Sequence, residues 1–331
     1  MNATDSSPII FYYYKNLSDP AFFWRLLEKR FRESGHDRPI EFRCWDCYHE
    51  LPGKDGDIYC YDGMVMSALA YNGYIRRLPA IIDVSGVFQW ILDGSMYRRT
   101  ICGIPFLICG NVLISRKGDG GPVRSVYDIK GGLAAPMKSM VFEYFLFAYF
   151  NMQSGSEEAV DAMKALGTIL GGREKYDNTE FAVYDGIDRF LRGECRYILG
   201  FTEDLRRLPA GDYLVQYANF SHGPHCEIPF FYTDYISIGR SPSGEKLLDC
   251  LDIAEIVSDS RFAYELCTGG GKLQYMLPAD RTLYPLLSAA DPVYDQLFAL
   301  ARSENNCVLR YGRDFYTEFQ RKADELLAAL E

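Results

Sequence analysis

Hydrophobic and polar positions along the first fifth of the chain predict strand, helix and strand in turn. Residues 9–14 form an apolar run typical of a buried strand, and residues 40–45 alternate with period two. Between them, large apolar residues recur at helical spacing. We expect Ser18 to cap this helix, with Pro20 in its first turn. The opening segment therefore predicts a βαβ unit.

Asp62 lies at the junction of the next predicted strand, residues 57–61, and the next predicted helix, residues 64–71. The carboxyl end of a strand is where open α/β sheets place ligand-binding groups. Aspartate is also a common N-cap, so its position alone leaves a binding role and a capping role equally open.

Later patterns continue this alternation of strands and helices. Apolar runs predict strands over residues 196–201, 213–217 and 228–237. Helical spacing appears over residues 137–170, 247–258, 283–301 and 315–330. With no long linker between them, these elements predict two α/β lobes that share the chain and enclose a ligand cleft. We expect lobe 1 to comprise residues 1–112 and 233–281, and lobe 2 residues 113–232 and 282–331.

Composition narrows the range of partners. The net charge of -10 argues against a nucleic-acid partner or an anionic membrane surface. The longest apolar run, residues 140–150, contains Glu143 and is too short to span a bilayer. No secretory signal is visible, so we expect a cytoplasmic protein, with a mature secreted form left open. We also expect a monomer.

Cys109 is the cysteine whose position is most informative. It ends the apolar run 104–109 and stands just before a second run, 112–114, so the thiol falls at a break in the backbone pattern. The alternative is that Cys109 is buried and inert, as most cysteines are. The chain has ten cysteines and no disulfide pattern. Cys44 and Cys47 form a lone CxxC without a second pair, so we expect no metal site.

Three further polar residues stand out. Asp234 lies in an otherwise apolar and aromatic strand, where a buried charge needs a partner or a function. Tyr232 is two residues away, on the same face of that strand. Glu203 is followed by Asp204, and this pair could equally be acids at the start of a helix.

The chain resembles the thiaminase I (thiamine pyridinylase) family in several segments that occur in order. They are residues 44–48, 61–63 with 73–79, 103–113, 200–203 and 228–234. The resemblance samples nearly the whole chain, although residues 120–195 are hard to align. It implies a two-lobed periplasmic-binding-protein-like fold of type II, in the α/β class, with a central ligand cleft.

The resemblance also implies a nucleophilic substitution on thiamine, with an organic base, amine or thiol as the incoming nucleophile. Cys109 would be the nucleophile and Glu203 its base. The remaining implied residues bind the substrate: Asp62 and Asp234 at the aminopyrimidine, and Tyr14, Tyr48, Tyr232, Tyr184 and Phe201 around it. Phe201 stands where the family commonly has tyrosine. No cofactor or metal is implied.

The chemistry of these residue types suits that reaction. A thiol with a pKa of about 8.5 needs a base near neutrality, and a carboxylate in a partly desolvated site can serve. Carboxyl groups at the amidine-like edge of the pyrimidine would offset charge that develops on the ring. Two alternatives remain open: a non-catalytic protein that binds thiamine or a related pyrimidine, and a hydrolase with a Cys–His pair. The latter has no local signature here.

Overall fold

The computed structural model describes residues 7–79, 82–119, 122–124, 128–134, 186–209, 211–218, 230–308, 313–318 and 321. The contacts between residues divide the chain into two compact units. Unit 1 comprises Met1–Cys109, Phe231–Ala290 and Ala301–Tyr316, and unit 2 comprises Gly110–Phe230, Asp291–Leu300 and Thr317–Glu331. The chain thus leaves unit 1 for the first time after Cys109, whereas the predicted lobes change after residue 112.

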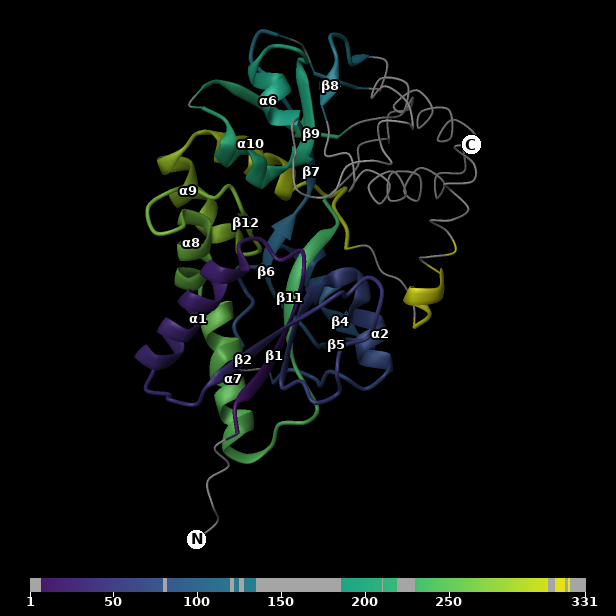
Figure 1. Ribbon diagram of the computed structural model, residues 1–331, viewed down its shortest axis with the longest axis vertical. Coiled ribbons are helices and arrows are strands. Elements are labelled where there is room, and N and C mark those ends of the chain that lie inside the picture. The colour runs from purple at the N-terminus through teal and green to yellow at the C-terminus, as the bar shows by residue number, and fades with distance from the viewer. Residues whose placement is uncertain are drawn as a thin grey trace. The chain divides into compact units, whose positions relative to one another are not determined.

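Unit 1 is built on a mixed six-stranded sheet (Figure 1). The strand order is β12-β6-β11-β3-β1-β2. The strands are β1 (Ile9–Tyr14), β2 (Ile40–Trp45), β3 (Ile58–Asp62), β6 (Ile104–Cys109), β11 (Tyr232–Ile238) and β12 (Leu277–Pro278). β1 runs parallel to β2 and β3, whereas β11 is antiparallel to both β3 and β6. The predicted strands over residues 9–14 and 40–45 are confirmed.

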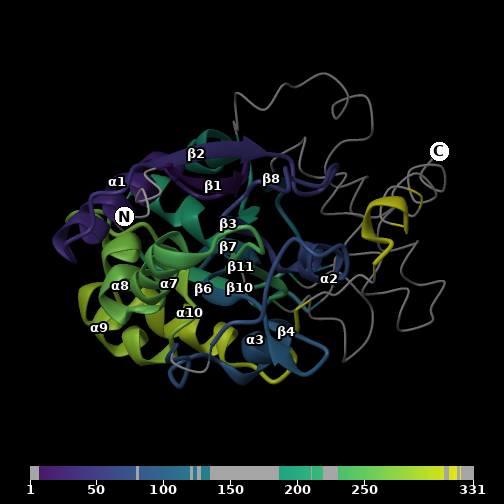
Figure 2. The same ribbon diagram turned by 90° about the horizontal axis from the view of Figure 1, so that it is seen from below.

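Helices cover both faces of this sheet. Figure 2 shows α7 and α8 on one side of β3 and β11, with α2 on the other side. α7 contacts β6, β11, α1 and α8. The described helices of unit 1 include α1 (Pro20–Glu33), η1 (Gly63–Val65), α2 (Met66–Tyr71), α3 (Gln89–Gly94), α7 (Gly244–Ser258), α8 (Ser260–Thr268), η5 (Arg281–Leu283) and α9 (Tyr284–Ala290). A short hairpin joins β4 (Met96–Tyr97) to β5 (Thr100–Ile101).

The cap of α1 differs from the prediction. Asp19, and not Ser18, is the N-cap, and its side chain accepts a hydrogen bond from the backbone N–H of Phe22. Asp19 adopts φ 41°, in the left-handed region that aspartate tolerates better than most residues. Pro20 then begins the helix, where its missing N–H costs nothing.

The single helix predicted over residues 283–301 is two helices. α9 ends at Ala290, and α10 runs over Val293–Ala301. Pro292 lies between them, and a proline both lacks the helical N–H and disfavours the helical conformation of the residue before it. The side chain of Asp291 accepts a hydrogen bond from the backbone N–H of Val293 at 2.9 Å, which helps to begin α10.

Unit 2 contains a four-stranded sheet with the order β10-β7-β9-β8. Its strands are β7 (Asn111–Arg116), β8 (Leu133–Ala134), β9 (Tyr197–Phe201) and β10 (Tyr213–Tyr217). α6 (Gly186–Leu191) precedes β9, and the 3₁₀ helix η4 (Thr202–Arg207) follows it directly. The predicted strand over residues 213–217 is confirmed. The helical pattern over residues 137–170 and most of that over 315–330 lie outside the described residues.

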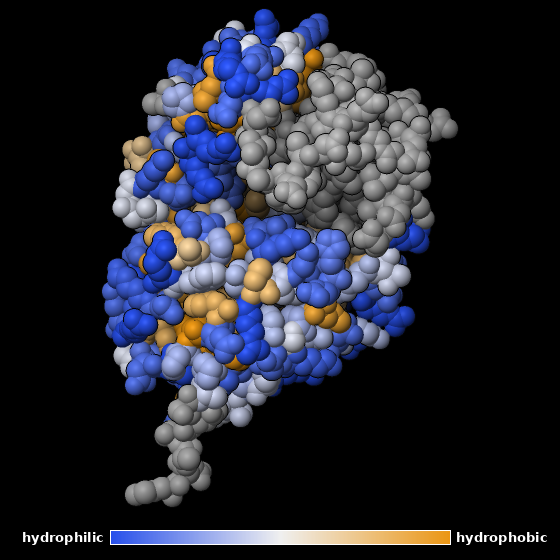
Figure 3. All heavy atoms as spheres, in the orientation of Figure 1, coloured by the Kyte–Doolittle hydropathy of each residue, from blue (hydrophilic) through white to orange (hydrophobic). Residues whose placement is uncertain are grey.

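The described surface is mainly hydrophilic on the face that Figure 3 shows, with apolar residues in small patches. The large exposed hydrophobic side chains come from four different helices: Tyr71, Leu191, Leu248 and Leu286. In the ranges that the structure describes, each helix is too short or too polar to cross a bilayer.

Candidate functional site

Two buried carboxylates lie side by side in the sheet of unit 1. Asp62 ends β3, and Asp234 is its direct partner across the antiparallel pair of β3 and β11. Directly opposed residues point to the same face, with Cβ atoms about 4.5–5.5 Å apart. Only 2% of Asp62 and 4% of Asp234 is exposed. The structure thus brings these two predicted site residues together.

Each carboxylate accepts a hydrogen bond from a tyrosine. The Tyr14 hydroxyl donates to Oδ1 of Asp234, and the Tyr48 hydroxyl donates to Oδ2 of Asp62 at 3.0 Å. The two tyrosine rings meet edge to face, with centroids 6.5 Å apart. Burial, and then the neighbouring carboxylates, raise the pKa of both hydroxyls well above the ordinary value. Both tyrosines therefore stay neutral donors near pH 7.

Asp62 fills the capping role that its sequence position left open. Its Oδ1 accepts a hydrogen bond from the backbone N–H of Met64 at 2.8 Å, so it caps η1. Burial raises the pKa of Asp62 to about 7, although the bonds from Met64 and Tyr48 act against this. A carboxyl group with such a pKa can both hold and release a proton near neutrality. Such a group can form a hydrogen bond with the ring nitrogen or the exocyclic amine of a heterocycle.

A proline in β6 explains the local geometry at Asp234. Asp234 pairs with Leu107, but Tyr235 pairs with Pro105, so the register shifts between Asp234 and Tyr235. Proline cannot donate a ladder hydrogen bond and is found in sheets at edges and bulges. The extra residue at this point is Phe106, whose carbonyl accepts a bond from Ala279 instead. Such bulges re-aim neighbouring side chains.

Cys109 ends β6 in the same sheet. It pairs with Tyr232 of β11, so these two predicted residues also lie together. Cys109 is half-buried, in contrast to Cys47 and Cys60, which are buried in the same unit. Tyr232 is buried, and its ring centroid is 4.2 Å from that of Phe231. The Tyr232 hydroxyl lies close enough to Tyr48 to contribute to the raised pKa of Tyr48, after burial, Asp62 and Cys47.

Glu203 and Phe201 belong to unit 2. Phe201 ends β9, and Glu203 is the second residue of η4. Phe201 is the N-cap of this helix, and Oδ2 of Asp204, at position N3, accepts a hydrogen bond from the backbone N–H of Phe201 at 3.0 Å. Oε2 of Glu203 accepts a bond from the Thr202 hydroxyl at 3.1 Å. Burial, and then the adjacent charge of Asp204, raise the pKa of Glu203 to about 7. A carboxyl group with such a pKa can accept and release a proton near neutral pH.

The sequence prediction missed Asn111. It begins β7, pairs with Phe201 and is only 3% exposed. Within the described part of the chain, its Oδ1 atom has no hydrogen-bond partner, an arrangement that a ligand N–H group could complete. The sequence pattern that could have indicated this residue is a polar asparagine directly before the apolar run 112–114.

Gly110 joins β6 to β7. A Cβ atom on this residue would lie 2.0 Å from the Phe230 ring, so only glycine fits between the two strands. Gly110 is therefore the single residue between Cys109 and Asn111, and packing leaves no room for a side chain there. Tyr184, the remaining predicted site residue, lies outside the described residues.

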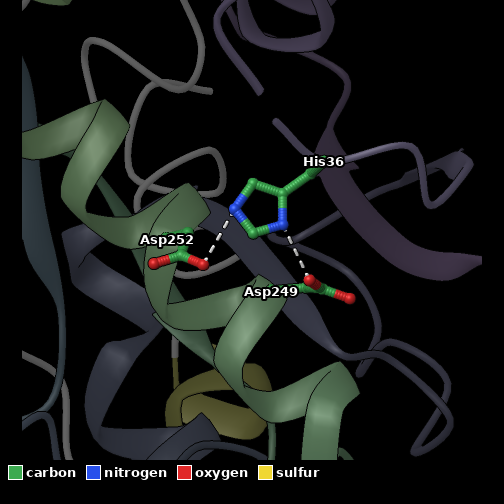
Figure 4. Close-up of side chains that lie close together, drawn as sticks. All are labelled: His36, Asp249 and Asp252. Carbon is green, nitrogen blue, oxygen red and sulfur yellow. Dashed lines mark hydrogen bonds and ion pairs between the residues drawn. The ribbon is translucent and has the colours of Figure 1, made fainter. Parts of the chain in front are cut away.

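One cluster has ligand types that suit a metal ion. Figure 4 shows His36 between Asp249 and Asp252, with each ring nitrogen 3.0 Å from a different carboxylate. Asp249 also accepts a hydrogen bond from the Arg38 guanidinium. Because the two carboxylates face opposite ring nitrogens and one is already paired with a cation, the cluster is better described as an ion-pair network. It ties α7 to the segment that follows α1.

Comparisons with known proteins agree with the fold. No family model matches the chain. Thiaminase-1 of Paenibacillus thiaminolyticus is 24% identical, with 92% of this chain and 83% of that protein covered. Clostridium botulinum thiaminase I, solved in complex with thiamin, has a TM-score of 0.85 at 22% identity over 97% of this chain and 99% of that one. An ABC transporter solute-binding protein from Thermotoga lettingae, bound to α-D-tagatose, has a TM-score of 0.71 at 12% identity, with 98% and 100% covered.

These likenesses confirm two predictions. The chain is similar to thiaminase I along nearly its whole length, and its mixed α/β fold is that of the periplasmic-binding-protein-like proteins.

Proposed function

We propose that this chain is a thiamine-degrading transferase. The observation that carries the proposal is the buried pair Asp62–Asp234, each carboxylate with its own tyrosine donor, in a chain similar to thiaminase I over 92% of its length. Thiamine is a cation with an aminopyrimidine ring. Two adjacent carboxyl groups, of which one has a pKa of about 7, can accept hydrogen bonds from the exocyclic amine and share a proton with a ring nitrogen.

In the proposed reaction, Cys109 is the nucleophile and Glu203 takes its proton. The thiolate adds to the pyrimidine ring and forms a C–S bond, and the electron pair passes into the ring. The bond between the methylene and the thiazolium nitrogen then breaks, and the thiazole leaves as a neutral molecule. An incoming base, amine or thiol adds to the methylene, and the C–S bond breaks as the ring regains its aromaticity. Asp62 and Asp234 offset the charge that builds on the ring.

Half-burial of Cys109 and the raised pKa of Glu203 support these two roles. A reactive thiol must be reached by substrate, which excludes a fully buried cysteine. A carboxylate with an ordinary pKa would be a weak base for a thiol. A pKa of about 7 for Glu203 narrows the difference between its pKa and that of a thiol, so proton transfer is easier. Along the chain, Cys109 is separated by Gly110 alone from Asn111, whose ladder partner Phe201 precedes Glu203 by two residues.

A binding protein without catalysis is the second candidate. The likeness to a solute-binding protein of an ABC transporter favours it, because the same fold serves solute capture there. Cys109 and Glu203 distinguish the two functions, since binding alone requires neither a nucleophile nor a base.

Mass spectrometry of the intact chain and of small molecules, after incubation with thiamine and pyridine, tests the proposal. We expect release of the thiazole alcohol, a pyrimidine–pyridine adduct and, with pyridine omitted, a pyrimidine-sized mass increment on Cys109. Cys109→Ser should bind thiamine but release no thiazole. Cys44→Ser, which changes an exposed thiol of the same unit, is the matched control and should retain activity. Turnover by Cys109→Ser would remove Cys109 from the mechanism, and bound but intact thiamine with the unaltered chain would favour the binding protein.

A further inference from the structure

Unit 1 contains a cationic hollow that the proposed reaction does not use. It has a volume of about 130 Å³ and is lined by Ala70, Ile75, Arg77, Tyr97, Arg98, Cys102 and Arg240. The space exceeds by several-fold the roughly 10–15 Å³ that a single water molecule needs. Three of the lining residues are arginines and none is acidic. In a chain with a net charge of -10, such a concentration of positive charge is unusual.

The three arginines keep donors available for a ligand. Arg240 donates from Nε to the carbonyl of Ile75 at 3.3 Å, and Arg98 lies over the ring of Tyr97 at 5.3 Å. In the part of the chain that the structure describes, neither these two nor Arg77 forms an ion pair with a carboxylate. Arg77 and Arg240 also act on the Cys102 thiol, whose pKa their charges lower against the larger, opposite effect of burial. The positive charges of Arg77 and Arg240 therefore both act at this hollow.

The hairpin of β4 and β5 holds Arg98 in an unusual conformation. Its two turn residues, Arg98 and Arg99, have φ angles of 49° and 62°. Turns with positive φ at both central residues favour asparagine and glycine, so arginine is an unfavourable residue at these two positions. Strained positions of this kind persist where the surrounding structure or a function requires them.

A larger hollow adjoins the first and shares Arg98 with it. It has a volume of about 480 Å³ and is lined by Trp90, Asp93, Gly94, Met96, Arg98, Arg99, Asn306, Cys307 and Val308. Trp90, Met96 and Val308 offer it apolar surface. Asp93 adds a negative charge that the smaller hollow lacks, so an anionic group would prefer the smaller hollow and an uncharged body the larger one.

We propose that these two hollows form a binding site for a small phosphorylated molecule, with the phosphate between Arg77, Arg98 and Arg240 and a planar or apolar body beside Trp90. Guanidinium groups bind phosphate oxygens in pairs of parallel hydrogen bonds, and a dianionic phosphate matches three positive charges better than a carboxylate does. Neither Asp62 nor Asp234 lines these hollows, and the proposal does not depend on the proposed reaction.

Calorimetric titration at fixed ionic strength with inorganic phosphate, phenyl phosphate and benzoate tests this site. We expect phenyl phosphate to bind more tightly than inorganic phosphate, and benzoate to bind more weakly than phenyl phosphate. Arg98→Gln and Arg77→Gln should each weaken phenyl phosphate about tenfold or more, the loss expected for one charged hydrogen-bonding partner. If Arg98→Gln fails to fold, Arg77→Gln alone tests the site, because Arg77 has an ordinary backbone conformation.

Arg25→Gln is the matched control, since Arg25 is exposed on α1 and lines neither hollow. It removes the same charge and should leave affinity unchanged. Three results would overturn the proposal: no binding of either phosphate, an equal loss of affinity in Arg25→Gln, or benzoate binding as tight as that of phenyl phosphate. None of these results bears on thiamine cleavage, so the two proposals are tested separately.

Discussion

At the scale of single residues, the carboxyl groups of Asp62 and Glu203 are alike in pKa. Both have pKa values raised to about 7, and in both the first cause is removal from water. Their surroundings differ in detail. Asp62 accepts hydrogen bonds from Met64 and Tyr48, whereas Glu203 lies next to a second acid, Asp204. In the proposed reaction, Asp62 binds the substrate and Glu203 accepts the proton of the thiol.

Glu203→Gln should lower kcat by about 10²- to 10⁴-fold, the range typical of a lost general base. The base acts when ionised, so kcat/KM of the unaltered chain should fall below pH 7, where Glu203 becomes protonated. This acid limb should be missing from the pH profile of Glu203→Gln. Asp204→Asn, which changes the neighbouring carboxyl, should keep the limb but move it to lower pH, because the charge of Asp204 raises the pKa of Glu203. An acid limb of the same position in Glu203→Gln would assign it to another group.

Asp62→Asn should change how stability depends on pH. In the folded chain the carboxyl of Asp62 titrates near pH 7, but after unfolding it titrates near its ordinary value of 3.8. Between these values the folded state binds more protons, so this group's contribution to the free energy of unfolding falls as the pH rises. The total is up to about 4 kcal/mol. Urea unfolding from pH 4 to 7.5 should show the unaltered chain losing stability relative to Asp62→Asn. Parallel curves would mean that the carboxyl titrates normally.

At the scale of elements, short departures from regular structure position the site. The register shift opposite Pro105 occurs beside Asp234, and the glycine between β6 and β7 places Cys109 at the end of its strand. β3 ends at Asp62 because that side chain turns back to cap η1. Asp62, Asp234 and Cys109 thus lie at strand ends or at a bulge, where the backbone departs from the regular ladder.

The start of α1 offers a direct test of capping. Asp19→Ala should lower the free energy of unfolding by about 1 kcal/mol, because the backbone N–H of Phe22 loses its side-chain acceptor. Ser18→Ala is the matched control and should change stability by less than about 0.5 kcal/mol. Asp19→Gly should cost less than Asp19→Ala, since glycine accepts the positive φ at this position. Denaturant titration of the three variants measures these differences. A larger loss in Ser18→Ala would restore Ser18 as the cap.

At the scale of the whole molecule, the sheet of unit 1 brings together residues that are distant in sequence. Tyr14 and Asp234 are 220 positions apart, yet their side chains are hydrogen-bonded. Unit 1 is assembled from three stretches of the chain and unit 2 from three more. A ligand that binds such a unit stabilises all of its stretches at once.

Thiamine should therefore raise the unfolding free energy of Cys109→Ser, which we expect to bind without turnover. At a concentration 100 times Kd the gain is about 2.7 kcal/mol. Asp234→Asn in the same background should show a much smaller gain, because the amide cannot replace a charged acceptor for the aminopyrimidine. Thermal unfolding at several thiamine concentrations measures both. Equal gains in the two variants would place thiamine away from the carboxylate pair.

Several features of this protein follow from its sequence alone. Strands over residues 9–14, 40–45 and 213–217 are fixed by local apolar patterns, because such short runs fold only with one face or both faces buried. The prominence of Asp62 and Asp234 also followed from sequence, since an acid within or directly after an apolar strand needs a reason to be there.

Tertiary structure decided the rest. Which residue caps α1 depended on a positive φ at Asp19. The break between α9 and α10, by contrast, is a local effect of Pro292 that the helical spacing concealed. The tyrosine assigned to each carboxylate, and the pairing of Asp62 with Asp234, depended on the order of strands in the sheet. Raised pKa values at Asp62 and Glu203 arise from burial, which sequence position does not measure. The three arginines of the cationic hollow come from separate segments, so only folding could bring them together.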